Sequence, residues 1–514
     1  MNEQFLKIGT KKPMRGIFNL SYEKKFTCDM GYLIPIVAEH VVPGDIFNIG
    51  NEIVVRMQPA VAPILHEINI KTEYFFVPNR LIMGSLDEED WENFITGGKD
   101  GTDTTTLDTW TPTGSYTDEG SLWDYFGFPT TGTPGTPMVP TGTLPLAFPR
   151  NAYNKVWNEW YRDENLQTER SYDDQSLALR NWEKDYFTAS MPWLQRGNSP
   201  SLPITLSGTI DITGKSQTIK FRTNSDSTAR DLAITSSGDL YTTTSPSANS
   251  IAWWSEPSLE TDISNGTATS FNISDFRLAA QIQKFQELNA RAGVRLTEFL
   301  QAHFNTAPND SRLQRSEYIG GSIQPLIISE VLQTSESGTT DQGNMAGHGI
   351  SAAQNYIAKY RVPEHGVILG LMSIIPRTLY QQGINRQWLY ESRYDFPDPL
   401  FVDLSEQEVY QAEIFVTNGN ATANETIFGY IGRYDEMRTK QSMVCGSMRS
   451  TFDYWHLSRQ FTSAPTLNSS FLQCNPRKDF LAVTTEDGFI VSVVNKITAI
   501  RPIPTMNRPG ILGV

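Results

Sequence analysis

Residues 64–76 constrain the fold more than any other stretch of this sequence, because hydrophobic and polar side chains alternate along them. One face carries Ile64, Ile68, Ile70, Tyr74 and Phe76, and His66 and Thr72 lie between them on the same face. The other face carries Glu67, Asn69, Lys71 and Glu73. A period of two over this length is typical of a β-strand with one buried side.

Further candidate strands lie toward both ends of the chain. They are short apolar runs, several of them bounded by Pro or Gly, at residues 33–42, 46–57, 367–375, 409–417 and 489–500. The last run is rich in β-branched residues, which suit a pleated surface. Residues 366–376 form the longest apolar stretch, about half of the roughly 20 residues that span a bilayer. We therefore expect a buried strand there and no membrane insertion.

Helices are predicted at few places. Aromatic and apolar residues at three- and four-residue spacing predict an amphipathic helix over 151–163. Ser274 resembles an N-cap for a second helix with an apolar stripe, which Gly293 should weaken or end. A short helix is expected around residues 296–303.

Two stretches are predicted to be surface insertions in one folded domain of residues 20–514. Residues 97–145 are rich in Thr, Gly and Pro, and residues 198–270 are rich in Ser and Thr. The second is long enough to hold a small β substructure, because a structureless loop of that length is unusual in a compact domain. Early and late strands separated by insertions fit a Greek-key sandwich whose connections have grown.

The charge of the chain limits its partners. Its formal net charge is −15, so on average it repels nucleic acid, and any DNA contact must come from a local basic patch. Residues 1–19 form a basic arm, in which Lys7, Lys11, Lys12 and Arg15 face one acid. The arm is either solvated or in contact with phosphates.

Cysteine usage favours a reducing compartment. The chain has three cysteines, Cys28, Cys445 and Cys474, an odd and small number that suggests no disulfide framework. Whether Cys445 and Cys474 approach each other stays open. The N-terminal residues lack the apolar core of a secretory signal, so we expect a soluble protein.

Motifs for catalysis or cofactor binding are absent from the sequence. It contains no GxGxxG, Walker A, HExxH, paired CxxC or GxSxG pattern, and its six histidines are not at metal-ligand spacing. Residues 343–349 (GNMAGHG) favour a tight backbone bend over a nucleotide loop. The acids at 87–90, before Trp91, favour a solvated helix start. We therefore expect no catalytic residue, cofactor or metal.

Trp253 and Trp254 stand out because they lie inside the Ser/Thr-rich insertion. They either fill a small core there or lie at a subunit contact, where Trp is enriched. The many aromatics, together with acids that could pair as in glycosidases, leave a secreted glycan-binding or glycan-cleaving sandwich as the alternative class. The missing signal peptide and disulfides count against that alternative.

Several strings, taken in order, resemble the major capsid protein of microviruses, in the gokushovirus branch. They include FTCDMGYLIPI (26–36), VVPGDIFNI (41–49), residues 57–82, DWENFITGG (90–98) and AYNKVWNEWYRDENL (152–166). The most specific covers 291–326, and others lie at 364–388, 454–474 and 495–504. The matches cover most of the chain outside the two insertions.

This resemblance implies a mainly β fold, an eight-stranded antiparallel jelly roll of the viral capsid type with long loop insertions and a few helices. It implies sixty copies in a T=1 icosahedral shell around circular single-stranded DNA, assembled in the host bacterial cytoplasm. It further implies a small basic DNA-binding protein and a pilot protein in the virion. The 198–270 insertion would then form a protrusion at each three-fold axis that meets a host surface receptor.

Basic residues at the two ends are the candidates for DNA contact. We expect Lys11, Lys12, Arg15, Arg501 and Arg508 to lie inside the shell near phosphates, with salt-sensitive contacts that do not read sequence. The alternative is that they bind acids of a neighbouring subunit.

Overall fold

The computed structural model describes residues 14–84, 88–98, 102, 104–131, 133, 138, 142, 144–200, 273–292, 295–306, 309–332, 345–404 and 406–506, and the backbone of short strands between 206 and 268. The chain divides into two compact units. Unit 1 comprises residues 1–194 and 289–514, and unit 2 comprises Gln195–Leu288.

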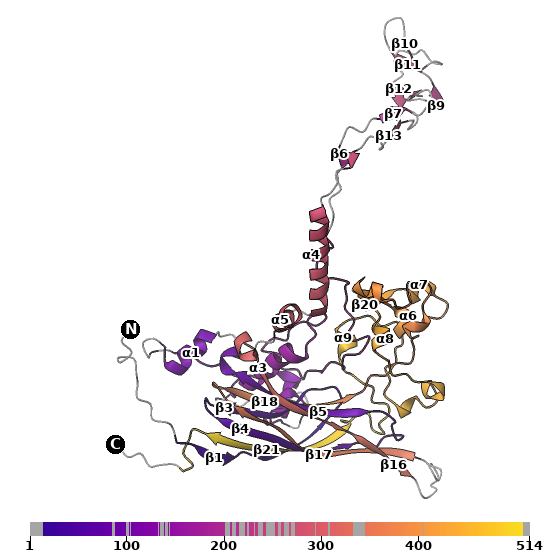
Figure 1. The fold of residues 1–514 in the computed structure, drawn as a ribbon. Helices are drawn as coiled ribbons and strands as arrows, with labels where there is room; N and C mark the ends of the chain where they lie inside the picture. Colours follow the sequence, from indigo (N-terminus) through magenta and orange to yellow (C-terminus); the bar gives the residue numbers. More distant parts are fainter. Residues whose placement is uncertain are drawn as a thin grey trace. The chain divides into compact units, whose positions relative to one another are not determined.

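Unit 1 is built on two antiparallel sheets (Figure 1). The larger has six strands: β1 (Gly16–Asn19), β21 (Phe489–Arg501), β4 (Ile46–Met57), β17 (Met345–Arg361) and β16 (Ile327–Leu332) in that order, with β2 (Tyr22–Cys28) also paired to β21. The smaller has four strands in the order β15 (Glu317–Pro325), β5 (Ile68–Pro78), β18 (Gly366–Pro376) and β3 (Ile34–Val41). The chain is therefore mainly β.

Burial along β5 confirms the alternation from Ile68 onward and shows where it stops, whereas the predicted residues 64–67 precede the strand. Residues from Ile68 to Tyr74 alternate between buried and half-buried. From Tyr74 to Pro78 every residue is buried. The smaller sheet is covered there on its second face as well, so period two disappears. Strand β18 is buried along its whole length, which confirms residues 366–376 as a buried strand.

The main core lies between the two sheets and contains a polar centre. Asn51 of β4 is fully buried, and its Nδ2 donates to Tyr74 Oη at 3.0 Å and to Thr72 Oγ1 at 3.3 Å. Asn355 Nδ2 donates to Asn51 Oδ1 at 3.2 Å. Buried amides are tolerated when they are bonded, so this network links both sheets through the apolar core.

A second core covers the other face of the smaller sheet. It packs Trp110 and Trp123, both fully buried, against Phe148 and Tyr153 of α3 (Phe148–Val156). The two indoles meet edge to face at 5.2 Å. Part of the predicted surface insertion 97–145 thus supplies core residues.

The predicted helix over 151–163 is present with different bounds. α3 begins at Phe148 because Pro149 is tolerated in a first turn, and it continues as a π-helical segment (Trp157–Tyr161). The short helix expected near 296–303 is α5 (Leu296–Phe304), and α1 (Glu88–Thr96) begins in the acidic run as expected.

A third, smaller core surrounds β19 (Glu406–Tyr410) and β20 (Ile427–Gly432), with Phe187 and Tyr380 packed inside it. The prediction of one strand over 409–417 is wrong. The chain turns into α6 (Gln411–Ile414), because Glu413 accepts the Tyr410 N–H at 2.9 Å and so caps the turn.

The tight bend predicted for 343–349 is also wrong for the described residues, because 345–349 are extended in β17. Gly347 has a different role: a Cβ there would lie 2.4 Å from the Ala62 carbonyl oxygen. The glycine allows two backbones to approach closely.

Unit 2 contains short antiparallel strand pairs, as expected for the 198–270 insertion. The strands are β6 (Leu206–Ser207), β7 (Ile212–Gly214), β8 (Phe221–Thr223), β9 (Asp226–Arg230), β10 (Leu232–Ile234), β11 (Leu240–Thr242), β12 (Ala252–Trp254), β13 (Leu259–Thr261) and β14 (Thr267–Ala268). They form the pairs β14–β6, β13–β7 and β10–β11 and the three-stranded sheet β12–β8–β9. Helix α4 (Ile273–Ala292) follows them. Ser274 lies inside its first turn and is not its N-cap.

Candidate functional site

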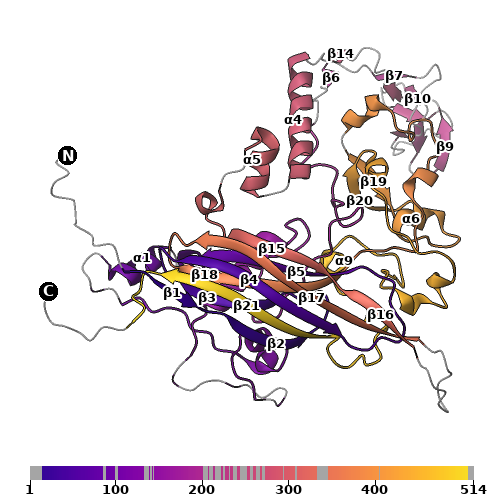
Figure 2. The same ribbon diagram turned by 60° about the horizontal axis from the view of Figure 1, so that its bottom comes forward.

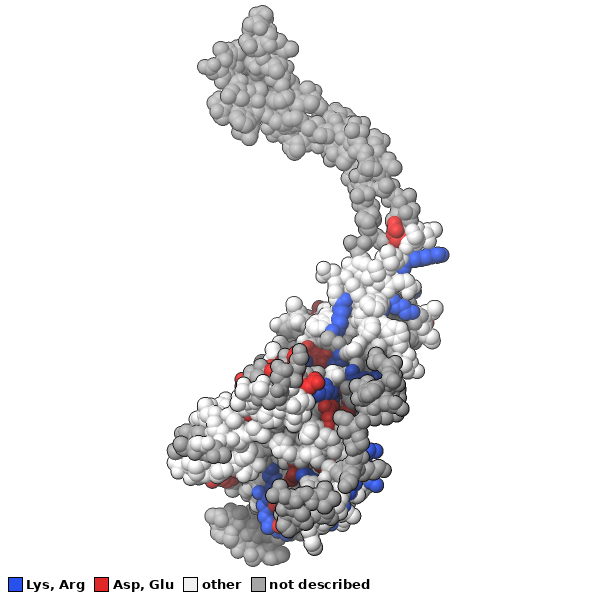
Figure 3. Space-filling model, turned by 90° about the vertical axis from the view of Figure 1, so that its left-hand side faces the viewer, with Lys and Arg blue, Asp and Glu red and all other residues white. Residues whose placement is uncertain are grey.

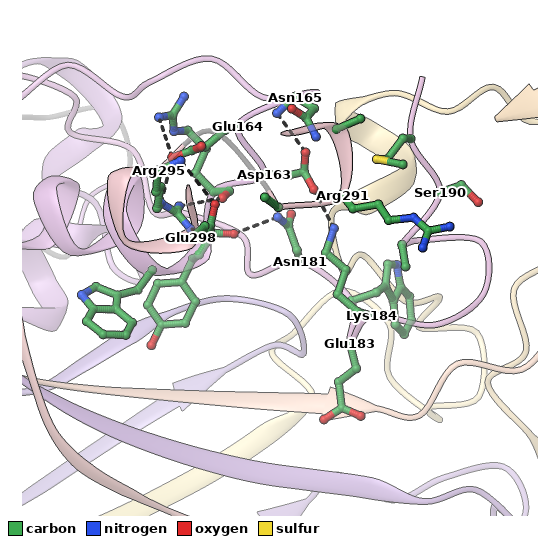
Figure 4. Close-up of a pocket in the computed structure, with 18 of the residues that line it drawn as sticks. Asp163, Glu164, Asn165, Asn181, Glu183, Lys184, Ser190, Arg291, Arg295 and Glu298 are labelled. Atoms are coloured by element: carbon green, nitrogen blue, oxygen red, sulfur yellow. Dashed lines mark hydrogen bonds and ion pairs between the residues drawn. The ribbon is translucent and has the colours of Figure 1, made fainter. Parts of the chain in front are cut away.

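A pocket of about 480 Å³ in unit 1 is lined by charged side chains (Figure 4). They come from the π-helical segment and the residues after it, from 180–184, and from 291–298 at the end of α4 and the start of α5. Aromatic Trp160 and Tyr161 form part of the wall. In composition this pocket resembles a ligand site. Whether it could bind a ligand depends on whether its charged side chains are free or already paired.

The charges in the pocket are held in ion pairs, some within the pocket and some with residues outside its lining. Arg295 Nε lies 2.8 Å from Glu164 Oε1, and its Nη2 donates to the Arg162 carbonyl at 3.1 Å. Lys184 Nζ lies 2.6 Å from Asp163 Oδ2. Arg295 follows α4 in the chain and Glu164 follows the π-helical segment, so the pairs tie these two parts of unit 1 together.

Deeper in the wall, Arg180 and Tyr161 share one carboxylate. Arg180 Nη1 lies 2.6 Å from Glu73 Oε2, and the Tyr161 hydroxyl donates to the same oxygen at 2.6 Å. Burial, and next the charge of Glu73, raise the pKa of Tyr161 well above its usual value. The phenol therefore stays a donor, and the cluster holds β5 against the π-helical segment instead of moving protons.

None of the pocket's paired groups is a nucleophile with an adjacent base. Among the described residues, no group of three or more His, Cys, Asp or Glu side chains is placed to hold a metal ion. No helix among them is long and apolar enough to cross a membrane. The three cysteines are unlinked: Cys28 and Cys474 are buried and Cys445 is exposed.

The candidate DNA-contact residues are spread over both ends of the chain. Lys11, Lys12 and Arg508 lie outside the described residues. Arg15 is exposed and immediately precedes β1, and Arg501 ends β21. Because Gly16 pairs with Arg501 across the sheet, the structure brings Arg15 and Arg501 to the same end of the larger sheet.

Arg501 is engaged by its own chain. Its Nη2 donates to the His40 carbonyl at 3.3 Å, its Nε lies 3.8 Å from Asp45 Oδ2, and its guanidinium lies over Phe47 at 5.5 Å. Burial raises the pKa of Asp45, while Arg501 and Arg15 act in the opposite direction. A phosphate contact by Arg501 stays a prediction.

Trp253 and Trp254 lie in strand β12 of unit 2. They pair in register with Arg222 and Phe221 of β8. Their side chains are outside the described part of the structure, so whether they fill a core or lie at a contact stays a prediction.

A second candidate surface was not found from the sequence. It is the outer sheet face, which we define as the side chains of β1, β2, β4, β17 and β21 that point away from the core between the sheets. Residues of these strands alternate between buried and less buried, so every second one belongs to this face. Its most exposed aromatic residue is Tyr356, at 71%. The face was missed because the Ala- and Gly-rich strand β17 was not recognised as a strand.

A third candidate surface is an exposed apolar loop at residues 388–404. Its large side chains include Trp388 (75% exposed), Phe396 (60%) and Leu400 (82%). Large apolar patches on a protein surface mark interaction sites.

Two packed sheets, a pocket whose charges are held in ion pairs, and extensive exposed surfaces are typical of a structural subunit. Comparison with known proteins agrees with this class. The family model described as "Capsid protein (F protein)" matches residues 7–511.

The curated relatives are all named capsid protein VP1. The chain is 32% identical to that of Chlamydia phage 1, over 99% of this chain and 98% of the relative. It is 32% identical to that of Bdellovibrio phage phiMH2K, with the same coverage, and 30% identical to that of Spiroplasma virus 4, over 94% and 93%.

The chain therefore belongs to the phage capsid protein (F protein) family, as a microvirus-type major capsid protein. The resemblance in the sequence is confirmed. Its role is structural and not enzymatic, which sets aside the glycan-cleaving alternative, and its place is the virion.

Proposed function

We propose that this chain is the repeating subunit of a T=1 icosahedral shell of sixty copies that encloses circular single-stranded DNA. The observation that carries the proposal is the family match, which spans nearly the whole chain. A capsid protein acts through oligomeric contacts, and closed symmetric assemblies reuse one set of surfaces in every copy.

The two sheets are proposed to form an eight-stranded viral jelly roll. Strand order supports this proposal. In the larger sheet β2, β21, β4 and β17 are successive neighbours, and in the smaller sheet β3, β18, β5 and β15 are. The first strand thus pairs with the last, and the chain passes repeatedly between the sheets, as two Greek keys require. Strands β1 and β16 extend the larger sheet beyond these eight.

The exposed apolar loop 388–404 is proposed to be buried between subunits of the shell. Trp and other aromatic residues are enriched at the centres of such interfaces. Helix α4 supports the same conclusion in unit 2, because its predicted apolar stripe is exposed at Leu278 (61%) and Ile282 (39%).

Unit 2 is proposed to form the surface protrusion at the three-fold axes and to contribute to attachment to a host receptor. Its separation as a compact unit of its own supports this role, because such an insertion can vary without disturbing the cores of unit 1. Trp253 and Trp254 are proposed contact residues in it.

The remaining partners are proposed from the same family membership. They are the packaged DNA, a small basic DNA-binding protein and a pilot protein, with assembly in the host cytoplasm. Lys11, Lys12, Arg15, Arg501 and Arg508 are the proposed phosphate contacts. Replacing Lys11, Lys12 and Arg15 with Ala should lower the DNA content of filled particles, and unchanged packaging would remove that role.

Electron microscopy of the purified protein, or of particles from infected cells, tests the proposed shell. We expect uniform closed particles that carry protrusions. A chain that stays monomeric under every assembly condition would contradict the proposal.

A further inference from the structure

We infer that the outer sheet face binds single-stranded DNA, with Lys359 and Arg361 at phosphates and Tyr356 stacked on a base. The inference rests on the proposed function, since it names the surface of the subunit that meets the genome. Its basis is the register of the larger sheet together with the charge and exposure of the side chains that this register brings together.

Register brings the functional groups into neighbouring rows of the sheet. One row runs Ile17, Ile500, Ile46, Arg361 across β1, β21, β4 and β17, and the next runs Asn19, Thr498, Asn48, Lys359. The third joins Lys496, Gly50 and Tyr356. Neighbouring strands lie about 4.8 Å apart, so Tyr356, Lys359, Arg361 and Lys496 form one patch.

The charge of this face is opposite to that of the chain. Its strands present five basic residues, Lys25, Arg56, Lys359, Arg361 and Lys496, and two acids, Glu23 and Glu52, whereas the whole chain has a net charge of −15. Figure 3 shows Lys and Arg along the lower part of unit 1, where this sheet lies. A net positive face on an acidic protein fits a polyanion.

Three of these cations are available to a ligand. Glu52 lies 2.7 Å from Lys496, and Glu23 lies 3.2 Å from Lys25, so the two acids are each matched by one base. Arg56, Lys359 and Arg361 are exposed and have no ion-pair partner among the described residues. If these three cations bound phosphates, no existing ion pair would be broken and no buried charge would be left unpaired.

Tyr356 provides the contact that distinguishes single strands. It is 71% exposed and lies directly across from Gly50, which has no side chain to cover the ring. Beyond Gly50, about 10 Å away across two strand spacings, lies Lys496. A base stacked on Tyr356 would keep its phosphate within reach of the neighbouring cations, as in proteins that bind single strands without reading sequence. A duplex, whose bases are already stacked, cannot use the ring in this way.

The face is open, and the described part of the chain begins beside it. In Figures 1 and 2 the labelled helices of unit 1 lie on the side of the smaller sheet, and no labelled helix covers the outer face of the larger one. The described chain begins immediately before β1, and Ile17 shares its row with Arg361, about 14 Å away across three strand spacings. The arm with Lys11 and Lys12 is therefore joined to the chain at the basic end of this patch.

The inference is tested by measuring how tightly a fluorescent oligothymidylate binds to the full chain. Fluorescence anisotropy follows the binding at salt concentrations from about 50 to about 200 mM. K359A/R361A should weaken binding about tenfold and reduce the salt slope by about 1.4, for two lost phosphate contacts. Y356A should weaken binding of the single strand by about tenfold but leave duplex binding unchanged, and Y356F should retain it.

The matched control is R438A/K440A, which removes two exposed cations from another surface. It should bind like the unchanged protein. The inference is overturned if K359A/R361A binds DNA no worse than this control. It is also overturned if Y356A leaves single-strand binding unchanged, or weakens single-strand and duplex binding equally. A dimer of the chain that is lost in the same variants would show that a second copy occupies the face, and would overturn it too.

Particle formation by the same variants separates this inference from the proposed function. All should form normal shells, with lower DNA content in K359A/R361A and Y356A. Shells that form with full DNA content contradict the inference alone. A chain that forms no shells contradicts the proposed function, while the anisotropy result still decides whether the face binds single strands.

Discussion

At the residue scale, the strongest test of the packing is a buried ion pair in the core around β19 and β20. Arg386 Nη1 lies 2.9 Å from Glu413 Oε1, and the side chain of Glu413 is fully buried. Tyr186 Oη donates to the other carboxylate oxygen at 2.8 Å. Burial raises the pKa of Glu413, although Arg386 acts against it. The charge is tolerated because both carboxylate oxygens accept hydrogen bonds, Oε1 from Arg386 and the Tyr410 N–H and Oε2 from Tyr186.

Arg386→Met should therefore lower the free energy of unfolding by about 3–5 kcal/mol, because it leaves Glu413 buried without its cation. The exposed pair Arg377–Glu67, at 3.0 Å, provides the control, and Arg377→Met should cost less than about 1 kcal/mol. Denaturant unfolding of both variants measures the difference. Equal losses would show that burial does not set the strength of the Arg386 pair.

His66 should make stability depend on pH. Its Nε2 donates to the Arg377 carbonyl at 2.8 Å while its Nδ1 accepts the Leu457 N–H at 3.3 Å, an arrangement that only the neutral ring can make. Burial lowers the pKa of His66 to about 4 from its usual 6.5. The unfolded chain thus binds a proton first, and stability falls as the pH drops from about 6.5 to 4.

The expected loss is about 3 kcal/mol over that window. His66→Gln, which cannot be protonated, should remove this part of the pH dependence while carboxylates elsewhere keep theirs. Unfolding by urea at pH 7, 5.5 and 4.5 compares the two proteins. A variant whose stability changes with pH as much as the unchanged protein would exclude His66 as the cause.

At the element scale, residues 104–131 supply core side chains, among them Trp110 and Trp123, in spite of their composition. Trp123→Ala should cost about 3–5 kcal/mol of stability, because it empties a fully buried site and removes a donor to the Pro129 carbonyl at 2.9 Å. Trp388→Ala, on the 75% exposed residue, should change stability by less than about 0.5 kcal/mol and instead reduce assembly. Urea unfolding and particle yield together check both; similar losses of stability would contradict the assignment of Trp123 to the core.

The elements that the sequence predicted well share a strong local signal. Strand β4 was predicted with the bounds that the structure has, and β3, β18 and β21 within one residue at each end, because their apolar or β-branched runs need no knowledge of neighbours. β17 was missed because the chain at 345–361 is rich in Ala and Gly, and its pairing partners in β4 and β16 supply the stability that its side chains do not.

The surfaces were harder to predict than the strands, because they too depend on pairing between distant segments of the chain. Arg15 and Arg501 stood out as basic residues near the ends, but the buried partner of Arg501, Asp45, is far from it in the sequence. Tyr356 and Lys359 became neighbours of Lys496 only through the register of three strands. Pairing between distant segments decides which charges share a face, and no local pattern contains it.

At the scale of the whole molecule, we expect the two units to have separable functions, with assembly in unit 1 and host attachment in unit 2. Replacing residues 201–272 with a flexible linker removes the short strands of unit 2 and leaves the three cores of unit 1 intact. Particles should still form but attach poorly to host cells, which a phage adsorption assay measures. Normal adsorption would show that attachment lies elsewhere on the shell.

The central claim is that many copies of this chain close into one defined shell, and the mass of the purified particle tests it most directly. Sixty chains of 57.8 kDa give about 3.5 MDa of protein. Native mass spectrometry of DNA-free particles should therefore show a single species near that mass. A distribution of open oligomers, or a single species of a different copy number, would contradict the account.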